Sequence, residues 1–190
     1  RLLLTARHHA CEAMANCVLE GILETVLKPS THDRALAGLD VWAVPFVDKD
    51  GVEYGDQGKN RIPRDHNRDY SDPPVYAETK ALRDMVRSWQ SSVPTVAMDL
   101  HCPHIRGPQN ECVYLVGSAD PANQEQQRRF SKILQDRKRG SLPYADADFL
   151  PFGTSWNTSH NFSQGLSFVR WMAKHPNVIL ATSFEIPYAT

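Results

Sequence analysis

Ionisable side chains directly follow two apolar runs, a placement that suits metal binding. His9 and Glu12 come shortly after the apolar run at 2–5, separated by two residues, and His101 follows the apolar run at 94–100. Zinc accepts imidazole nitrogen and carboxylate oxygen, and catalytic zinc sites use three protein ligands plus water. We therefore predict that His9, Glu12 and His101 bind one Zn²⁺ ion.

Other potential ligands lie close to these three residues. His8 and His104 are each within three positions of a predicted ligand and are rival candidates. Cys11 and Cys102 are also near predicted ligands, but we expect neither thiol to bind the ion. Because the four cysteines form no CxxC pair, they do not indicate a ribbon-type zinc site, and we expect them to be free, buried thiols.

A carboxylate near such an ion gains a chemical role. Glu185 follows the apolar run at 178–184, where a strand is expected to leave the core. A bound zinc ion lowers the pKa of its water, and a neighbouring carboxylate can then take the proton. We predict that Glu185 is the general base. Without a metal nearby, it would be only a glutamate at the end of a strand.

The segment 48–74 is rich in Gly, Pro, Asp and Arg and has no periodicity. It predicts a loop of about 27 residues, and loops of that length in compact domains are usually functional or disordered. Four cationic residues fall within ten positions: Lys59, Arg61, Arg64 and Arg68. An arginine offers a planar fork for a carboxylate, and a second one near a metal can stabilise an oxyanion. A charged, solvated loop is the ordinary alternative.

The rest of the chain alternates apolar runs with helical stripes. This alternation predicts an α/β fold with a mostly parallel mixed sheet and helices on both faces, in one domain spanning 1–190. Ligands of such sheets bind beyond the carboxyl ends of the strands. The predicted strands are 2–5, 39–47, 94–100, 112–116 and 178–184, and the predicted helices are 12–27, 75–89, 121–139 and 162–173, with a second long loop at 141–160.

The composition excludes several classes of function. The chain has 190 residues, of which 41% are hydrophobic and 23% charged, which is ordinary for a globular domain. A net charge of -1 indicates no general attraction to nucleic acid. No apolar run approaches the roughly 18 residues that a membrane span needs. Because the chain starts and stops close to apolar runs, we expect it to be cut from a longer protein at both ends.

Taken in chain order, these segments resemble the zinc carboxypeptidase family, which contains carboxypeptidase A-like peptidases and related deacylases. Its members show HxxE after a strand, then an NPDG stretch, an Asp-x-Asn-Arg box, a strand-end Asp-x-His and a late Glu. In this chain Asp48 replaces the usual Asn of the second motif. The matching segments are His9–Glu12, Asp48–Glu53, Asp65–Arg68, Asp99–His101 and Glu185.

The resemblance implies roles for the residues of the long loop. Asp65 would orient His9, and such contacts tune the basicity of a metal ligand. Asn67 and Arg68 would bind the terminal carboxylate of the substrate. Arg61 would stabilise the oxyanion, although Arg64 competes for this role.

The chain also departs from the family pattern. The spacing from Arg61 to the Asn-Arg pair is short. Peptidases of the family place a mobile tyrosine between the last histidine and the catalytic glutamate. Tyr144 is the only tyrosine between Tyr114 and Tyr188, and it lies in the second predicted loop. No residue therefore aligns with the mobile tyrosine.

Three functions follow from the resemblance. The first is hydrolysis of a C-terminal peptide bond by a zinc metallocarboxypeptidase. The second is a zinc amidohydrolase that removes an acyl group from an N-acyl amino acid or cuts a peptidoglycan peptide. The third is an inactive binding domain with the same fold. Both enzymes would act on a substrate with a free carboxylate.

Overall fold

The computed structural model describes residues 1–28, 36, 38–89, 92–142 and 144–188. Its centre is a five-stranded sheet in the order β2-β1-β3-β5-β4, in which only β4 is antiparallel to its neighbour. The sheet confirms the predicted mostly parallel, mixed α/β fold. Its strands are β1 (Leu2–Ala6), β2 (Val41–Val44), β3 (Thr95–His101), β4 (Tyr114–Val116) and β5 (Val178–Glu185).

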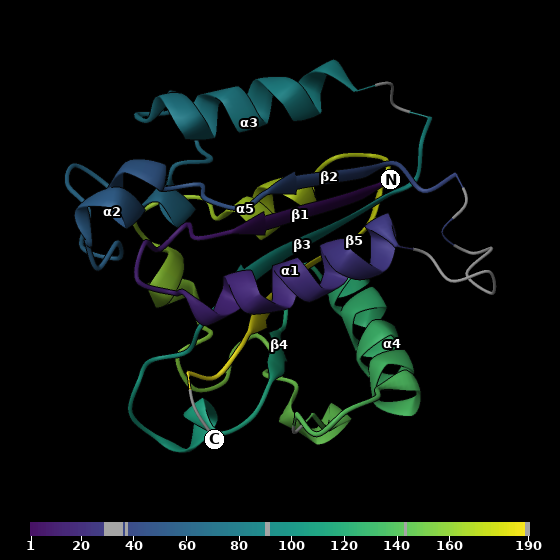
Figure 1. Ribbon diagram of the computed structural model, residues 1–190. Helices are drawn as coiled ribbons and strands as arrows, with labels where there is room; N and C mark the ends of the chain where they lie inside the picture. The colour runs from purple at the N-terminus through teal and green to yellow at the C-terminus, as the bar shows by residue number, and fades with distance from the viewer. Residues whose placement is uncertain (29–35, 37, 90–91, 143, 189–190) are drawn as a thin grey trace.

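Helices cover both faces of the sheet, as Figure 1 shows. One face packs against α3 and α5, and their core includes Leu3, Ala97 and Phe168. The other face packs against α1 and α4, which share contacts with Phe184 of β5. The helices are α1 (Met14–Leu27), α2 (Lys49–Tyr54), α3 (Ala77–Ser88), α4 (Pro121–Arg137) and α5 (Phe168–Met172).

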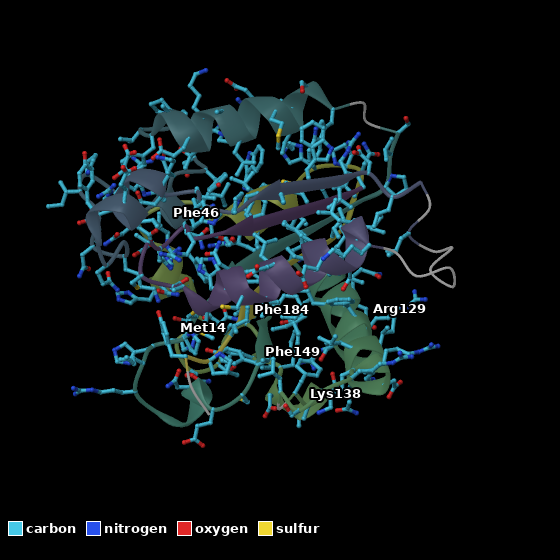
Figure 2. All side chains as sticks on the ribbon, in the orientation of Figure 1. Met14, Phe46, Arg129, Lys138, Phe149 and Phe184 are labelled. Carbon is cyan, nitrogen blue, oxygen red and sulfur yellow. The ribbon has the colours of Figure 1, made fainter. Side chains whose placement is uncertain are left out.

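The sequence of α4 explains both its start and its orientation. Asp120 caps the helix by accepting hydrogen bonds from the backbone N–H groups of Ala122 and Asn123, and proline at the first helical position fits this start. Phe149 and Phe184 lie between α4 and the sheet, whereas Arg129 on the outer side of α4 is exposed (Figure 2). The inner face of the helix combines the apolar side chains of Phe130 and Leu134 with the buried Asn123 and Gln127, which both donate to the Ala181 carbonyl of β5.

The topology creates a crevice at the carboxyl ends of β1 and β3. The chain leaves β1 through α1 to reach β2 on one side, and it returns through α3 to β3 on the other side of β1. Parallel sheets bind ligands where the strand order reverses in this way. The predicted metal ligands follow these two strands.

Some predicted boundaries are wrong. The segment 48–74 contains α2, whose start is capped by the Asp48 carboxylate accepting from Gly51 N, and the short 3-10 helix η2 (His66–Arg68). A cap of this kind stabilises a six-residue helix that shows no periodicity. The predicted helix at 162–173 begins only at Phe168, where the Ser167 side chain caps it by accepting a hydrogen bond from Arg170 N, and the 3-10 helix η5 (Ser159–Phe162) precedes it. None of the helices in the described ranges is long and apolar enough to cross a membrane.

Candidate metal centre and active site

The three predicted metal ligands converge at the carboxyl edge of the sheet. His9 and Glu12 lie between β1 and α1, and His101 is the last residue of β3. All three side chains are buried, and their ligand atoms lie within 4.8 Å of one another. His9 Nδ1 is 2.8 Å from Glu12 Oε1, and His101 Nδ1 is 2.7 Å from Glu12 Oε2.

The other nitrogen of each imidazole contacts a buried carboxylate. His9 Nε2 lies 3.3 Å from Asp65 Oδ2, and His101 Nε2 lies 2.6 Å from Asp99 Oδ2. Contacts of this kind fix the tautomer and orientation of a metal-binding histidine. Both Nδ1 atoms are thereby directed towards Glu12. The structure thus places Asp65 beside His9, where the family resemblance puts it.

Opposite charges hold this cluster together. Burial lowers the pKa of His101, but the carboxylates of Asp99 and Glu12 outweigh burial and raise it well above the usual value. Burial raises the pKa of Glu12, but His9 and His101 outweigh burial and lower it well below the usual value. Because a metal displaces protons from its ligands, zinc binding at this site must release protons and weaken as the pH falls.

The cluster has the donor set of a zinc site. Two imidazole nitrogens and a carboxylate form a set found in catalytic zinc centres, which leave a fourth position for water or substrate. Next to these ligands, Glu185 Oε2 is buried and has no hydrogen-bond partner among the described residues. An unpaired buried carboxylate oxygen is costly unless a cation or a donor satisfies it. The residues present therefore fit a zinc ion with bound water.

Neither rival histidine contacts Glu12, although His8 forms a second group of possible ligands with Asp99 and His101 and His104 lines the cavity described below. His8 is buried behind the cluster, with Nδ1 at 2.8 Å from Asp99 Oδ1 and Nε2 at 2.6 Å from the Tyr70 hydroxyl. Both of its nitrogens are therefore engaged away from Glu12. His104 is exposed, and its imidazole contacts only the backbone of Arg106.

Glu185 is held in place by strands on both sides. It is the last residue of β5, paired in register with His101 of β3 and with Tyr114 of β4. Burial raises its pKa to about 7, and the nearby His101 imidazole opposes the rise. A carboxylate whose pKa lies near neutrality is suited to taking up and returning a proton.

A cavity of about 620 Å³ opens onto this centre. The side chains of His9, His101, Asp65 and Glu185 line the part of the cavity next to the predicted zinc site, which we call its metal end. Its other walls come from β4, from the loop between η4 (Asp146–Asp148) and α5, and from α5 itself. The volume is within the range of small-molecule sites.

Asn67 and Arg68 line the cavity as well. The Asn67 side-chain amide lies 3.0 Å from His101 Nε2, and its carbonyl accepts a hydrogen bond from Phe168 N at 3.0 Å. Arg68 donates from Nε and Nη2 to the backbone carbonyl of Asn161, and from Nη1 to that of Asn67. Three of the five N–H groups of Arg68 are thus used within the chain, and two are left for a ligand.

The two arginines predicted as oxyanion stabilisers point to acidic partners outside the cavity lining. Arg61 binds the carboxylates of Asp48 and Asp56, and Arg64 lies 3.2 Å from Asp69 Oδ1. These ion pairs stabilise the loop. The structure thus brings His9, Glu12, Asp65, Asn67, Arg68, His101 and Glu185 together and leaves Arg61 apart from them.

The cation that does face the metal end is Lys59. Its Nζ lies 3.6 Å from Glu12 Oε1, and the side chain lines the cavity. Burial lowers the pKa of Lys59, but Glu12 and Glu185 outweigh burial and raise it. The preceding Gly58 has φ +99°, and a Cβ there would overlap the backbone nitrogen of Ala10. Only glycine permits this close approach, which seats Lys59 beside the ligands.

The sequence also gives no indication that Tyr114 would line the site. This buried residue of β4 lines the cavity, and its hydroxyl has no hydrogen-bond partner among the described residues. Its position opposite Glu185 depends on an antiparallel register that no local pattern encodes. Tyr144, in contrast, lies 2.6 Å from the Ser131 hydroxyl and does not line the cavity.

All four cysteines are free, as predicted, but the expectation that they are buried is wrong for three of them. Only Cys102 is buried, and Cys17 is exposed. Cys11 lies 3.8 Å from the Tyr188 hydroxyl, away from the ligand atoms. Neither Cys11 nor Cys102 belongs to the metal-ligand groups of the described residues.

Comparison with known proteins identifies the fold. No protein-family model and no curated relative matches the sequence. The metallo-carboxypeptidase from Burkholderia cenocepacia has a TM-score of 0.66 at 19% identity, over 98% of this chain and 47% of that chain. The metallo-carboxypeptidase from Pseudomonas aeruginosa, in complex with (2-guanidinoethylmercapto)succinic acid, has a TM-score of 0.68 at 21% identity, over 98% of this chain and 48% of that chain.

A third structure extends the comparison to a different reaction. Succinylglutamate desuccinylase from Vibrio cholerae has a TM-score of 0.60 at 14% identity, over 98% of this chain and 49% of that chain. The chain thus spans about half the length of each of these structures. It has the zinc carboxypeptidase-like fold that metallo-carboxypeptidases share with this desuccinylase.

Proposed function

We propose that the chain carries the active site of a zinc-dependent hydrolase that cleaves an amide bond near a free carboxylate. The observation that carries this proposal is the convergence of His9, Glu12 and His101 beside an unpartnered, buried Glu185. Structural ion-pair clusters rarely leave a carboxylate oxygen buried without a partner, whereas a metal-bound water supplies one. The shared fold of metallo-carboxypeptidases supports the same conclusion.

The protein's own groups divide the work of hydrolysis. When bound, zinc lowers the pKa of water and polarises the scissile carbonyl. Glu185 accepts the proton of the attacking water and delivers it to the leaving nitrogen, so that the carboxylate is regenerated at the end. Asp65 and Asp99 hold His9 and His101 in their orientations throughout.

We propose that Arg68 binds the substrate carboxylate. Replacing Arg68 with Ala should raise KM for substrates with a free carboxylate by about 10- to 100-fold, since a charge-assisted hydrogen bond contributes about 1.5–3 kcal/mol. KM for the same substrate with an amidated C-terminus should change little. Steady-state kinetics on both substrates measures the effect, and Arg129→Ala on the exposed side of α4 is the matched control. An unchanged KM removes Arg68 from this role.

The oxyanion-stabilising cation is a separate question, because Arg61 and Lys59 compete for it. Lys59→Met should lower kcat/KM by about 10²- to 10³-fold, as expected for loss of one donor to a developing oxyanion. Arg61→Met should have a smaller effect on kcat/KM, since Arg61 binds Asp48 and Asp56. Thermal unfolding of both variants checks the fold. A larger loss for Arg61→Met returns the role to the arginine.

A second candidate function is a zinc amidohydrolase acting on N-acyl amino acids. One observation favours it: the fold is shared with a desuccinylase. A panel of blocked C-terminal dipeptides, N-acyl amino acids and muropeptides separates the two enzymes by kcat/KM. Turnover of none of these by zinc-loaded protein supports the inactive binding domain.

A further inference from the structure

The cavity holds a second arginine besides Arg68. Arg170 belongs to α5 and lines the same cavity as Arg68. The guanidinium carbons of Arg68 and Arg170 each lie 4.9 Å from the centre of the Phe162 ring. One aromatic ring therefore brings two guanidinium groups to the same part of the wall.

The two arginines differ in what they bind. Arg68 donates to two backbone carbonyls and lies 3.9 Å from Asp65 Oδ2. Arg170 makes no side-chain hydrogen bond or ion pair within the described residues, although it is half-buried. Its N–H donors are thus available to a ligand in the cavity.

The charge along the cavity is unevenly distributed. Asp65 and Glu185 are its acidic lining residues among those described, and both lie at the metal end. Burial lowers the pKa of Arg68, Asp65 opposes this shift, and the charge of Arg170 lowers the pKa further. Two close guanidinium groups repel each other, and an anion between or beside them relieves that repulsion.

We propose that Arg170 is a second carboxylate-binding residue, so that the site selects substrates whose terminal amino acid carries an acidic side chain. Arg68 then binds the terminal carboxylate and Arg170 binds the side-chain carboxylate. The planar fork of arginine suits a carboxylate, whereas an amide of the same shape fills it poorly because its NH₂ group donates. This selectivity belongs to the proposed hydrolase, but it is measurable as binding without any turnover.

The test compares two ligands that differ in one group, N-acetyl-glutamate and N-acetyl-glutamine. Calorimetric titration uses zinc-loaded protein in a Glu185→Gln background, so that neither ligand is consumed. We expect the acidic ligand to bind about 10- to 100-fold more tightly, and Arg170→Gln to abolish the difference. Arg170→Lys should restore part of it. Arg68→Ala should weaken both ligands together, and Arg129→Gln should change neither.

The outcomes separate the two proposals. If both ligands bind equally to the parent protein, or if Arg170→Gln weakens both to the same degree, Arg170 does not bind the side-chain carboxylate of the ligand and only packs against Phe162. If the preference for N-acetyl-glutamate depends on Arg170 but no substrate is hydrolysed by the protein with Glu185 intact, the anion site stands and the hydrolase proposal fails. Thermal unfolding confirms that each variant is folded before titration.

Discussion

Replacing Glu185 with Gln is expected to lower kcat by about 10²- to 10⁴-fold while the zinc content stays unchanged. The substitution keeps the shape of the side chain and removes its ability to accept a proton. Because Glu185 is not one of the three clustered ligands, the ion should remain bound. Steady-state kinetics and elemental analysis of the same preparation measure both quantities.

A matched control is Glu53→Gln, which changes an exposed glutamate of α2. It should leave both kcat and zinc content as they are. The pH profile adds a second check: a general base must be ionised, so kcat/KM should fall as the pH drops through the pKa of Glu185. Loss of zinc in parallel with activity in Glu185→Gln contradicts the assignment of this residue as the base.

Replacing His101 with Ala is expected to have the second large effect, the loss of zinc together with a loss of stability. The substitution removes a ligand and leaves two buried carboxylate oxygens, Glu12 Oε2 and Asp99 Oδ2, without the imidazole that contacts them. Removing one partner of a buried charge pair lowers the free energy of unfolding by about 3–5 kcal/mol. Zinc stoichiometry and denaturant unfolding, each with and without added zinc, measure the two effects.

His104→Ala is the control for this prediction, because His104 is an exposed histidine three residues further along the chain. It should keep the full zinc content and the stability of the parent protein. In His101→Ala, added zinc should give little recovery of stability, since a ligand stabilises only in proportion to its binding to the folded state. Full zinc retention in His101→Ala removes this residue from the ligand set.

Much of the fold and of the metal end could be predicted because both depend on strand ends. The runs 2–5, 94–100 and 178–184 are apolar enough to be recognised as buried strands, and parallel strands bring their carboxyl ends to one edge. His9, His101 and Glu185 follow those runs, and their convergence is a consequence of topology. The fold class was confirmed for the same reason.

The loop residues that reach the site could not be predicted in this way. Whether Arg61 or Lys59 faces the metal end depends on the ion pairs of Arg61 with Asp48 and Asp56 and on the close packing of Gly58 against Ala10. Neither contact leaves a periodic signal in the sequence. The cation nearest the ligands therefore appears only once the loop is folded.

Two residues that line the cavity, Tyr114 and Arg170, are not indicated by the sequence for a related reason. Tyr114 reaches the site through the antiparallel pairing of β4 with β5, and Arg170 reaches it through the short helix α5. More than sixty residues separate Tyr114 from Glu185 in the chain, and about a hundred separate Arg170 from Arg68. Register and helix placement at that range are tertiary properties, and no single sequence pattern specifies them.

The most direct test of the metal centre is the zinc content of the purified protein. The protein is purified without added metal, dialysed against metal-free buffer and analysed by elemental analysis beside His101→Ala. The three-ligand site predicts about one equivalent of zinc per chain for the parent protein and a large loss for the variant. A parent protein with less than roughly half an equivalent, and no increase after incubation with zinc, would contradict a zinc centre built from His9, Glu12 and His101.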